Sequence, residues 1–496
     1  MVMDLKTLLA PFSIDAPEIG LTDLVLDSRE VAIHKGFLAI KGHQQDGREF
    51  IPQAVSLGAK VILSETDDES AHGQMSMREH SLIVEFFQLA RNVAELAQQF
   101  FSDPTEQLST IAVTGTNGKT STTHFCCQLA QSLGQKSVFV GTLGQGSLND
   151  LRETINTTPD AISMQRIAYQ SLQEQAQIMA FEASSHALVQ DRTAYINTNV
   201  AIFTNLTRDH LDYHGTMEAY AAAKRRLLKQ PALKTVVLNA DDPESINWLA
   251  NKPESVVAVL IGIDTDVADT EKFCIARNVE LNNSGLRFAL HTSWGNTQVQ
   301  VPLFGKFNVY NLISAASAML ALGHGIEAVT DALALIQPVC GRAERYHHND
   351  YADTIVDYAH TPDALENILC SLRGHVSGRI ICVFGCGGER DQGKRPMMGR
   401  IAEQYADAII VTNDNVRSED AQAIANDILS GIHDTSKVHV ELDRQEAIKM
   451  AVSQSSKEDL ILVAGKGHED YQIIGTTKIK YDERQFINKL YSEVLQ

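Results

Sequence analysis

The sequence is poor in the features that mark secreted, zinc-binding and membrane proteins. Its 496 residues include seven cysteines but no C-x-x-C pair, which argues against a disulfide framework and a zinc ribbon. No apolar run approaches the roughly 20 residues that cross a bilayer, so we expect no membrane insertion. The first residues carry Asp4 and Lys6 without a long apolar run, so we expect no signal peptide and a cytoplasmic location.

Aromatic residues and positive charge are also scarce. Phe, Trp and Tyr make up 6% of the chain, and 42 Lys and Arg face 62 Asp and Glu, which gives a net charge of −20. Nucleic-acid binding needs a basic surface and often stacking aromatics, so we expect no nucleic-acid partner. Hydrophobic residues at 44% and charged residues at 21% are ordinary values for globular chains. The composition therefore favours a multidomain enzyme.

From about Leu108 onward, short apolar runs alternate with helix-length segments, which is typical of parallel sheets covered on both faces. The runs form two series, before and after Gln337-Pro338. A smaller α/β unit precedes a junction at Asp103-Pro104, since a residue before proline is pushed out of the helical region. We therefore predict three α/β domains, at residues 1–103, 104–337 and 338–496, with an antiparallel β-rich addition at 255–301. The predicted strands are residues 110–113, 138–140, 178–181, 200–203, 354–356, 380–384, 408–411 and 460–463, and the predicted helices include 364–372 and 421–429.

The strongest motif is the heptapeptide TGTNGKT at residues 114–120, which lies between an apolar strand and a helix that starts near Thr120. Its glycines let backbone amides curl around phosphate groups at a helix N-terminus. Lys119 can reach the β- and γ-phosphates, and the Thr120 hydroxyl can bind Mg²⁺. Only two residues separate Gly115 from Gly118, unlike the standard Walker motif, but the strand–loop–helix context predicts ATP binding. The predicted ATP contacts in this loop are Gly115, Thr116, Asn117, Gly118, Lys119, Thr120 and Ser121.

Carboxylate and imidazole groups follow two further strands of the central series. Glu182 comes directly after the run at 178–181, and His210 follows the run at 200–203. The carboxyl ends of strands in a doubly wound sheet form the ligand crevice. His210 and His214 have the i, i+4 spacing of a zinc pair, and each polar residue taken singly is also typical of a cap or a buried hydrogen-bond partner. The neighbouring phosphate loop favours an oxygen-rich Mg²⁺ site instead.

Four polar loops follow strands of the third domain, at residues 357–362, 385–396, 414–417 and 464–469. Because the carboxyl ends of parallel strands meet at one edge of a sheet, we expect these loops to cluster and to face the ATP loop. Their arginines are suited to bidentate contacts with carboxylates.

These motifs together resemble the Mur ligase family, whose ATP loop reads TGTNGKT as here, and within it the members that add meso-diaminopimelate to UDP-N-acetylmuramoyl-L-alanyl-D-glutamate. Matching motifs run from Leu26 to Glu469, with a gap around 255–300. The resemblance implies a small N-terminal α/β UDP-binding domain, a central P-loop ATPase-like, mostly parallel sheet and a C-terminal Rossmann-like α/β domain for the amino acid. It also implies an ATP-dependent, ADP-forming ligase of peptidoglycan precursor synthesis with Mg²⁺ as cofactor, and we expect a monomer.

The resemblance assigns roles to further residues, motif by motif. The predicted contacts with the uridine nucleotide and the muramoyl-dipeptide are Leu26, Ser28, His43, Gln44, Gln45, Asn156, Thr157, Thr158, Ser184, Gln190 and Arg192. The further predicted ATP contacts are Asn308, Asn311 and Arg342. The predicted diaminopimelate site consists of Arg390, Asp414, Asn415, Val416, Arg417, Gly465 and Glu469. The predicted catalytic residues are Lys119, Glu182, His210 and Lys224, and the predicted magnesium ligands are Thr120, Glu182, His210 and Lys224 as its carbamate.

Lys224 taken from the sequence alone is typical of an exposed helical lysine. The resemblance places it where the family carries a carbamoylated lysine. That modification turns a cation into an anion, which can approach Mg²⁺ and orient an acyl phosphate.

The implied reaction has two steps. The γ-carboxylate of the D-glutamate attacks the γ-phosphate of ATP, which forms an acyl phosphate and ADP. The amino group of diaminopimelate then attacks the acyl carbon, and phosphate leaves as the amide forms. The protein's part in such a reaction is mainly positioning and charge neutralisation.

One position departs from the family. The diaminopimelate signature reads DNPR, whereas this chain has Val416 in place of the proline, which leaves the backbone of the loop less fixed. Arg417 is retained and can pair with the distal carboxylate that distinguishes diaminopimelate from lysine. The alternatives are a lysine-adding or folylpolyglutamate-type ligase, a simple P-loop hydrolase and an ATP-switched binding protein. The DSR motif at residues 27–29 and Arg417 argue against the ligase alternatives.

Overall fold

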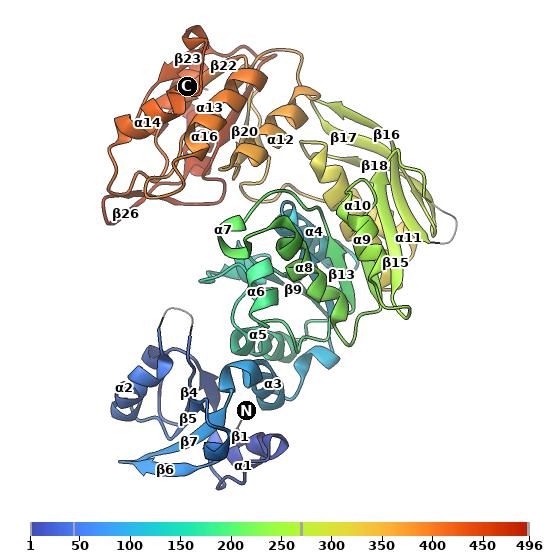
Figure 1. The fold of residues 1–496 in the computed structure, drawn as a ribbon. Coiled ribbons are helices and arrows are strands. Elements are labelled where there is room, and N and C mark those ends of the chain that lie inside the picture. The colour runs from blue at the N-terminus through green and yellow to red at the C-terminus, as the bar shows by residue number, and fades with distance from the viewer. Residues whose placement is uncertain (1, 43–44, 268–270, 494–496) are drawn as a thin grey trace.

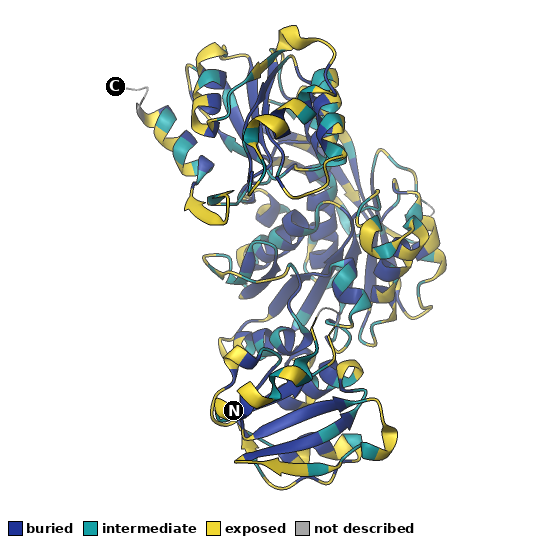
Figure 2. Ribbon diagram, turned by 60° about the vertical axis from the view of Figure 1, so that its left-hand side comes forward, coloured by how far each residue is buried: buried dark blue, intermediate teal, exposed yellow. Residues whose placement is uncertain are grey.

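The computed structural model describes residues 2–42, 45–267 and 271–493. Three α/β domains follow one another along the molecule, with the central domain between the N-terminal and C-terminal ones (Figure 1). In each domain the strands are largely buried and the covering helices expose their outer faces (Figure 2). The predicted three-domain α/β fold is confirmed. Within the described residues, no helix has the length and apolar character needed to span a bilayer.

The N-terminal domain contains one five-stranded sheet. In spatial order its strands are β3 (Asp23–Val25), β4 (Lys35–Ala39), β5 (Val61–Thr66), β7 (Ser81–Phe87) and β6 (Met75–Arg78). All neighbours are parallel except β6 and β7. Val61 and Leu63 pack into one core and Ile62 into another, because successive side chains of a strand point to opposite faces. The remaining elements are β1 (Met3–Asp4), β2 (Gly20–Leu21), α1 (Leu5–Leu9), α2 (Ile51–Ser56) and α3 (Leu89–Phe101).

The central domain is built on an eleven-stranded sheet. In spatial order its strands are β11 (Asp150–Arg152), β10 (Gly144–Ser147), β9 (Ser137–Gly141), β12 (Ile178–Glu182), β8 (Ser109–Thr114), β13 (Val200–Phe203), β14 (Thr235–Asn239), β15 (Val257–Ile263), β16 (Lys272–Asn282), β17 (Gly285–Thr292) and β18 (Gly295–Val301). The strands from β9 to β16 in this order are parallel. The four strands predicted between residues 110 and 203 correspond to β8, β9, β12 and β13.

The β-rich segment at 255–301 differs from the prediction in one respect. β17 and β18 are antiparallel as predicted, but β15 pairs in parallel with β14, and β16 in parallel with β15. The segment therefore extends the parallel sheet before it turns antiparallel. Turn residues indicate where the chain reverses, whereas the direction of the next pairing depends on the path of the crossover, which no local signal specifies.

Helices cover both faces of the central sheet. On one face, α4 (Lys119–Ser132) and α10 (Phe307–Ala321) pack together and share a core with Ile111 and Val113 of β8. On the other face, Ala112 of β8 packs in a core that includes residues of α5 (Ala161–Gln173). Burial on both faces explains the apolar run at residues 111–113 in the middle of β8. The remaining helices are α6 (Ser185–Val189), α7 (Leu211–His214), α8 (Met217–Arg225), α9 (Glu244–Ala250) and α11 (Ile326–Leu333).

The C-terminal domain contains a six-stranded sheet. In spatial order its strands are β19 (Glu344–Tyr346), β20 (Asp353–Asp357), β24 (Leu460–Ala464), β21 (Ile380–Phe384), β22 (Ala408–Val411) and β23 (Val438–Val440). Only β19 is antiparallel to its neighbour, and the strands predicted in this domain are confirmed. The remaining elements are the hairpin β25 (Tyr471–Ile474) and β26 (Thr477–Lys480), and the helices α12 (Pro362–Arg373), α13 (Lys394–Tyr405), α14 (Ala421–Leu429), α15 (Arg444–Gln454) and α16 (Glu483–Glu493).

Polar contacts join neighbouring domains. Arg166 Nη2, on α5, donates a hydrogen bond to Asp23 Oδ1 (3.0 Å) on the N-terminal domain. On the other side, Asn117 Nδ2 of the ATP loop donates to Asp363 Oδ2 (3.2 Å) at the start of α12. The ATP loop therefore faces the C-terminal domain, as the sequence predicts.

Candidate active site

The phosphate loop leaves β8 at Thr114 and enters α4 at Lys119, as predicted. Gly115 and Gly118 have φ angles of +144° and +85°, which side chains rarely adopt. A Cβ on Gly118 would lie 2.5 Å from Asn311 Oδ1, and one on Gly115 would overlap the Thr204 hydroxyl. Both positions therefore require glycine, and the loop leaves the first amides of α4 available to an anion.

Two lysines converge on one carbonyl oxygen of this loop. Lys119 Nζ donates to Gly115 O (2.9 Å) and to Thr116 O (2.8 Å). Lys224 Nζ, from α8, donates to the same Gly115 O (2.7 Å) and lies 4.3 Å from the ring centre of Tyr220. Lys224 is 1% exposed, so it is not the exposed helical lysine that its sequence alone indicates.

Burial also changes the charge balance of the two lysines. Desolvation lowers the pKa of Lys119, against the attraction of Glu182 and Asp209. Desolvation, followed by repulsion from Lys119, lowers the pKa of Lys224 far below its ordinary value. The Lys224 amine is buried and bonded to a carbonyl oxygen rather than to a carboxylate, so its neutral form is favoured.

Glu182 lies at the end of β12, beside the phosphate loop, and is 1% exposed. Its Oε1 accepts from Thr142 N (2.8 Å) and its Oε2 from Thr142 Oγ1 (3.3 Å). Thr142 Oγ1 also lies 3.2 Å from Thr157 Oγ1, a predicted substrate contact. A Cβ on Gly141 would overlap Glu182 Oε1, so the carboxylate lies directly against the backbone of β9.

His210 lies among other aromatic rings. It is exposed, precedes α7 with φ +53°, and its ring centre is 5.0 Å from that of His186. His214 Nε2 lies 2.9 Å from Ser185 Oγ, so this imidazole has a hydrogen-bond partner. Among the described residues, no three His, Cys, Asp or Glu side chains are arranged to hold a metal ion.

The three further predicted ATP contacts fall into two groups. Arg342 Nη2 donates to Thr120 Oγ1 (3.4 Å), and its guanidinium lies 4.7 Å from the ring centre of Tyr358, so Arg342 brings the C-terminal domain to the phosphate loop. Asn311 Nδ2 donates to Asn308 Oδ1 (3.0 Å), and both side chains are buried on α10. Asn311 therefore packs against the backbone of Gly118, and Asn308 holds the Asn311 side chain in place.

The predicted muramoyl-dipeptide contacts of the central domain form a linked set. Thr158 Oγ1 donates to Glu182 O (2.6 Å) and accepts from Ser184 N (3.1 Å). Arg192 Nη1 donates to Thr158 O (2.8 Å), and its Nη2 donates to Gln190 Oε1 (2.6 Å). The neighbouring Asn156 is exposed. The set is therefore joined to the main chain of Glu182 through Thr158.

The predicted nucleotide contacts of the N-terminal domain lie on a separate surface. Ser28 is buried, and its Oγ donates to Gln53 Oε1 (3.1 Å). Leu26 is half-buried and Gln45 is exposed. His43 and Gln44 lie outside the described residues.

The predicted diaminopimelate residues are brought together at the carboxyl ends of β22 and β24. Asn415 Nδ2 donates to Glu469 Oε2 (3.0 Å), and Arg417 Nη1 donates to Gly388 O (2.8 Å). A Cβ on Gly465 would lie 2.8 Å from Asp414 Oδ2, so the Asp414 carboxylate packs against the backbone of Gly465.

Two other predicted residues of this set have different surroundings. Arg390 is exposed on the loop after β21. Val416 is buried in the same core as Phe384 and Val411, so apolar packing holds the loop where the family has proline.

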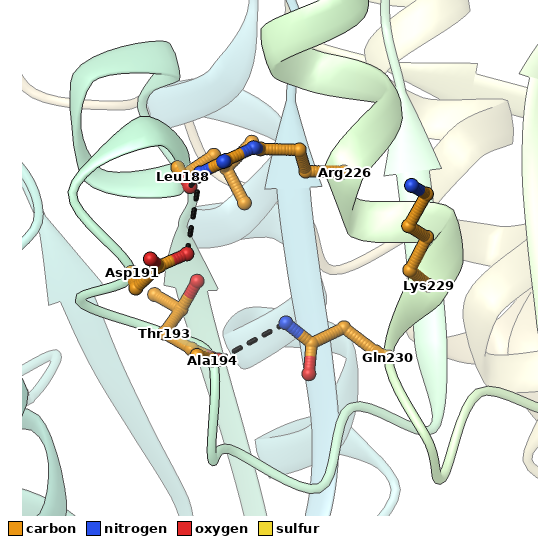
Figure 3. A pocket seen from close by; sticks show the side chains of 7 residues that line it. All are labelled: Leu188, Asp191, Thr193, Ala194, Arg226, Lys229 and Gln230. Atoms are coloured by element: carbon orange, nitrogen blue, oxygen red, sulfur yellow. Dashed lines mark hydrogen bonds and ion pairs between the residues drawn. The ribbon is translucent and has the colours of Figure 1, made fainter. Parts of the chain in front are cut away.

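One cavity lies beside these sites. It has a volume of about 270 Å³ and is lined by Leu188, Asp191, Thr193, Ala194, Arg226, Lys229 and Gln230 (Figure 3). Arg226 Nη1 donates to Leu188 O (2.7 Å) and Asp191 Oδ1 (3.2 Å) across it. None of the predicted site residues lines the cavity, although its lining residue Asp191 lies between Gln190 and Arg192 in the chain.

Sequence reasoning missed two residues that the structure places at the site. Asp363 Oδ2 accepts from Asn117 Nδ2 and from Thr207 Oγ1, each at 3.2 Å. Lys466 is fully buried among the predicted amino-acid residues. Asp363 gave no signal beyond its place in the first turn of a helix, and Lys466 gave only the weak Gly-Lys-Gly pattern.

Comparison with known proteins matches three family models along the chain. Residues 21–101 match the Mur ligase family catalytic domain, residues 113–319 the Mur ligase middle domain, and residues 341–467 the Mur ligase glutamate ligase domain.

Solved structures extend this similarity over the full length. A structure of UDP-N-acetylmuramoyl-L-alanyl-D-glutamate–2,6-diaminopimelate ligase is 34% identical, with a TM-score of 0.73 and 100% of both chains covered. MurF ligase from Thermotoga maritima in complex with ADP shares the fold at 17% identity, with a TM-score of 0.64 and 95% and 97% of the two chains covered. Mycobacterium tuberculosis folylpolyglutamate synthase, at 17% identity, has a TM-score of 0.61 and covers 75% of this chain and 91% of its own.

The family models span the phosphate loop, the Glu182 region and the loops after β22 and β24, which are the parts of the chain that the structure brings together. The chain therefore belongs to the Mur ligase family of ATP-dependent, amide-bond-forming ligases.

Proposed function

We propose that this enzyme adds meso-diaminopimelate to the D-glutamate γ-carboxylate of UDP-N-acetylmuramoyl-L-alanyl-D-glutamate, in cytoplasmic peptidoglycan precursor synthesis. The full-length similarity to the solved diaminopimelate ligase carries the proposal. Asn415, Arg417 and Glu469 support it, because Asn415 bonds to the Glu469 carboxylate and accepts from Arg417 Nη1 at its backbone oxygen (3.3 Å), which places a guanidinium near a carboxylate. Diaminopimelate has two amino groups and two carboxylates, and a site with both a guanidinium and carboxylates suits such a mixture of charges.

The residues of the central domain suit the activation of a carboxylate by ATP. The nucleotide phosphates would bind the amides that begin α4, with Lys119 released from its bonds to Gly115 O and Thr116 O to contact them. Thr158, Ser184 and Arg192 would hold the muramoyl-dipeptide so that its γ-carboxylate faces the γ-phosphate. Arg342, next to Thr120, would offset charge on the phosphoryl group.

Mg²⁺ fits the oxygen donors beside the phosphate loop. Glu182 and Thr120 offer oxygen ligands beside the phosphate loop, and His210 offers an imidazole from the loop before α7. Magnesium typically binds one or two protein oxygens together with substrate phosphates and waters. Bound there, the ion would neutralise charge on the phosphates.

We further propose that Lys224 is carbamoylated. Its burial, its position at Gly115 O and its lowered pKa support a neutral amine that can react with CO₂. The resulting carbamate would replace the cation beside Gly115 O with an anion, which could serve as a further ligand to Mg²⁺.

The domain boundaries are proposed at 103/104 and 337/338, and the enzyme is proposed to act as a monomer. Asp103 adopts φ +45° directly after α3, and Pro338 lies between α11 and β19. Each boundary falls between the last α-helix of one domain and the first strand of the next domain.

The test is ADP release by the purified protein with Mg²⁺-ATP and the UDP-muramoyl-dipeptide, with meso-diaminopimelate and L-lysine offered separately. We expect turnover with diaminopimelate and a preference over lysine of about 100-fold or more. Arg417→Ala should abolish most of that preference. The matched control is Arg373→Ala, since Arg373 pairs with Asp407 at the opposite end of the sheet.

Each alternative gives a different result in this assay. Turnover with lysine alone would overturn the proposed amino acid and keep the ligase. ADP release that does not need the UDP-muramoyl-dipeptide would indicate a simple hydrolase. ATP binding without amino-acid-dependent ADP release would indicate a switch.

A further inference from the structure

The two loops of the proposed amino-acid site come from strands that are not neighbours. Residues 414–417 follow β22 and residues 465–469 follow β24, and β21 lies between these strands. The hydrogen-bond ladder of the sheet therefore does not connect the two loops directly. Their spacing depends on contacts beyond the strand ends.

Arg444 connects the two loops through their backbones. It is the first residue of α15 and its side chain is fully buried. Its Nη1 donates to Asn413 O (3.3 Å) and its Nη2 donates to Ala464 O (2.9 Å). These carbonyls belong to the residues directly before Asp414 and Gly465, so one guanidinium holds both loops at their origins.

A carboxylate from the C-terminal helix fixes the orientation of this guanidinium. Arg444 Nε donates to Glu483 Oε2 (2.7 Å), and both side chains have 0% exposure. Glu483 is the first residue of α16. All three nitrogens of Arg444 are therefore used at once, which the planar fork of arginine permits and a lysine ammonium on a flexible stem does not reproduce.

A second buried cation joins the loops on the side of the proposed site. Lys466 Nζ donates to Asn415 Oδ1 (3.2 Å) and Glu469 Oε2 (3.0 Å), and it lies 3.6 Å from Asp414 Oδ1. Lys466 touches the site residues themselves, whereas Arg444 touches only the backbone behind them. A role of Arg444 in amino-acid binding would therefore be indirect.

We propose that Arg444 is a positioning residue for the amino-acid site, and that Glu483 holds it in place, so that the C-terminal helix α16 helps to set the geometry of substrate binding. This inference rests on the proposed function, because it concerns the binding of the amino acid. A shift of either loop by about an ångström would separate Asn415 from Glu469 and misplace Arg417, and such misplacement is costly in preorganised sites.

The test compares the kinetics of Arg444→Lys and Glu483→Gln with those of the wild type. We expect each variant to raise KM for diaminopimelate about tenfold or more, while KM for ATP and for the UDP-muramoyl-dipeptide changes less than about twofold. Added guanidinium ion should lower the raised KM of Arg444→Ala, because it can occupy the vacated space between Asn413 O and Ala464 O. Rescue of this kind would not occur if the substitution only destabilised the fold.

The chain offers a matched control at the other end of the same sheet. Arg379 Nη2 donates to Asp459 Oδ2 (2.8 Å) just before β24 begins. Arg379→Lys should lower thermal stability without changing KM for diaminopimelate.

The outcomes separate this inference from the proposed function. Lack of diaminopimelate turnover by the wild type would overturn the proposed function. Normal wild-type turnover together with an unchanged KM in Glu483→Gln, or with equal rises for all three substrates, would overturn the positioning role alone. Because Glu483→Gln keeps the size and shape of the side chain, it decides the question even if Arg444→Lys fails to fold.

Discussion

At the scale of single residues, the site is organised around one backbone oxygen. Gly115 O accepts hydrogen bonds from Lys119 and from Lys224, so two lysine amines meet within hydrogen-bond reach of one atom. Two buried cations at such a spacing repel each other, and loss of one positive charge relieves the repulsion. Conversion of Lys224 to a carbamate would relieve it completely and turn it into attraction.

The first prediction concerns the modification of Lys224. Carbamate formation needs a neutral amine, and burial together with Lys119 lowers the pKa of Lys224 below its ordinary 10.5. We therefore expect the protein to take up ¹³C-bicarbonate near pH 7, giving a carbamate signal in the ¹³C NMR spectrum that is lost as the pH falls and the amine is protonated. Lys224→Ala should remove both the signal and activity, and formate or acetate should restore part of the activity.

Lys229 provides the control for this labelling experiment. It lies five residues further along the chain, at the end of the short 3₁₀ helix that follows α8, and is exposed, so Lys229→Ala should keep the signal. A wild-type protein without the signal, or a signal that persists in Lys224→Ala, would contradict carbamoylation at this position.

At the scale of elements, the helix α4 has a glycine in the left-handed region near each end. Gly118 precedes it with φ +85°, and Gly134 follows it with φ +78°. Their surroundings differ, because a Cβ on Gly118 would lie 2.5 Å from Asn311 Oδ1, whereas a Cβ on Gly134 would have no atom within 4 Å. The same substitution therefore tests two effects in one helix.

The second prediction uses this pair. Gly134→Ala should cost about 1 kcal/mol of stability from backbone strain alone and leave nucleotide affinity unchanged. Gly118→Ala should also displace the phosphate loop, and we expect it to weaken ATP binding at least about tenfold, measured by calorimetry. Equal nucleotide affinity in the two variants would show that the amides of this loop do not bind the phosphates.

The elements that sequence reasoning predicted well are those with strong local signals. β8, β12 and β24 each contain an apolar run of at least three residues, and the polar residues after these strands were predicted to form the site. The parallel pairing of β15 and β16 was predicted wrongly, because the direction of pairing depends on contacts far apart in the sequence. For the same reason the positions of Asp363 and Arg444 could not be predicted, since their partners lie on other elements.

At the scale of the whole molecule, a histidine connects the central and C-terminal domains. His375 Nε2 accepts from Gly305 N (2.9 Å), and its Nδ1 lies 2.8 Å from Asn282 O. One nitrogen must therefore accept while the other donates, which only the neutral imidazole can do. The ring also packs against Phe304 at 4.6 Å between centres.

The third prediction is that protonation of His375 loosens the contact between these domains. Burial lowers the pKa of His375 below its ordinary value of 6.5, so an unfolded or detached His375 binds a proton more readily than the docked one. The contribution of His375 to stability is then complete above pH 6.5 and is lost as the pH falls from 6.5 towards the lower pKa of the docked form. Small-angle scattering should show a larger radius of gyration for the wild type near pH 5 than near pH 8.

Two variants isolate this effect from the other titrations of the molecule. His375→Asn retains a donor for Asn282 O but cannot titrate, so its radius of gyration should not change between pH 8 and pH 5. His124 lies inside the central domain, where burial lowers its pKa to about 4, so His124→Gln should alter the pH dependence of unfolding and leave the domain spacing unchanged. A wild-type radius that stays constant between pH 8 and pH 5 would show that the other contacts of the interface, such as that of Asn117 with Asp363, suffice to keep the two domains together.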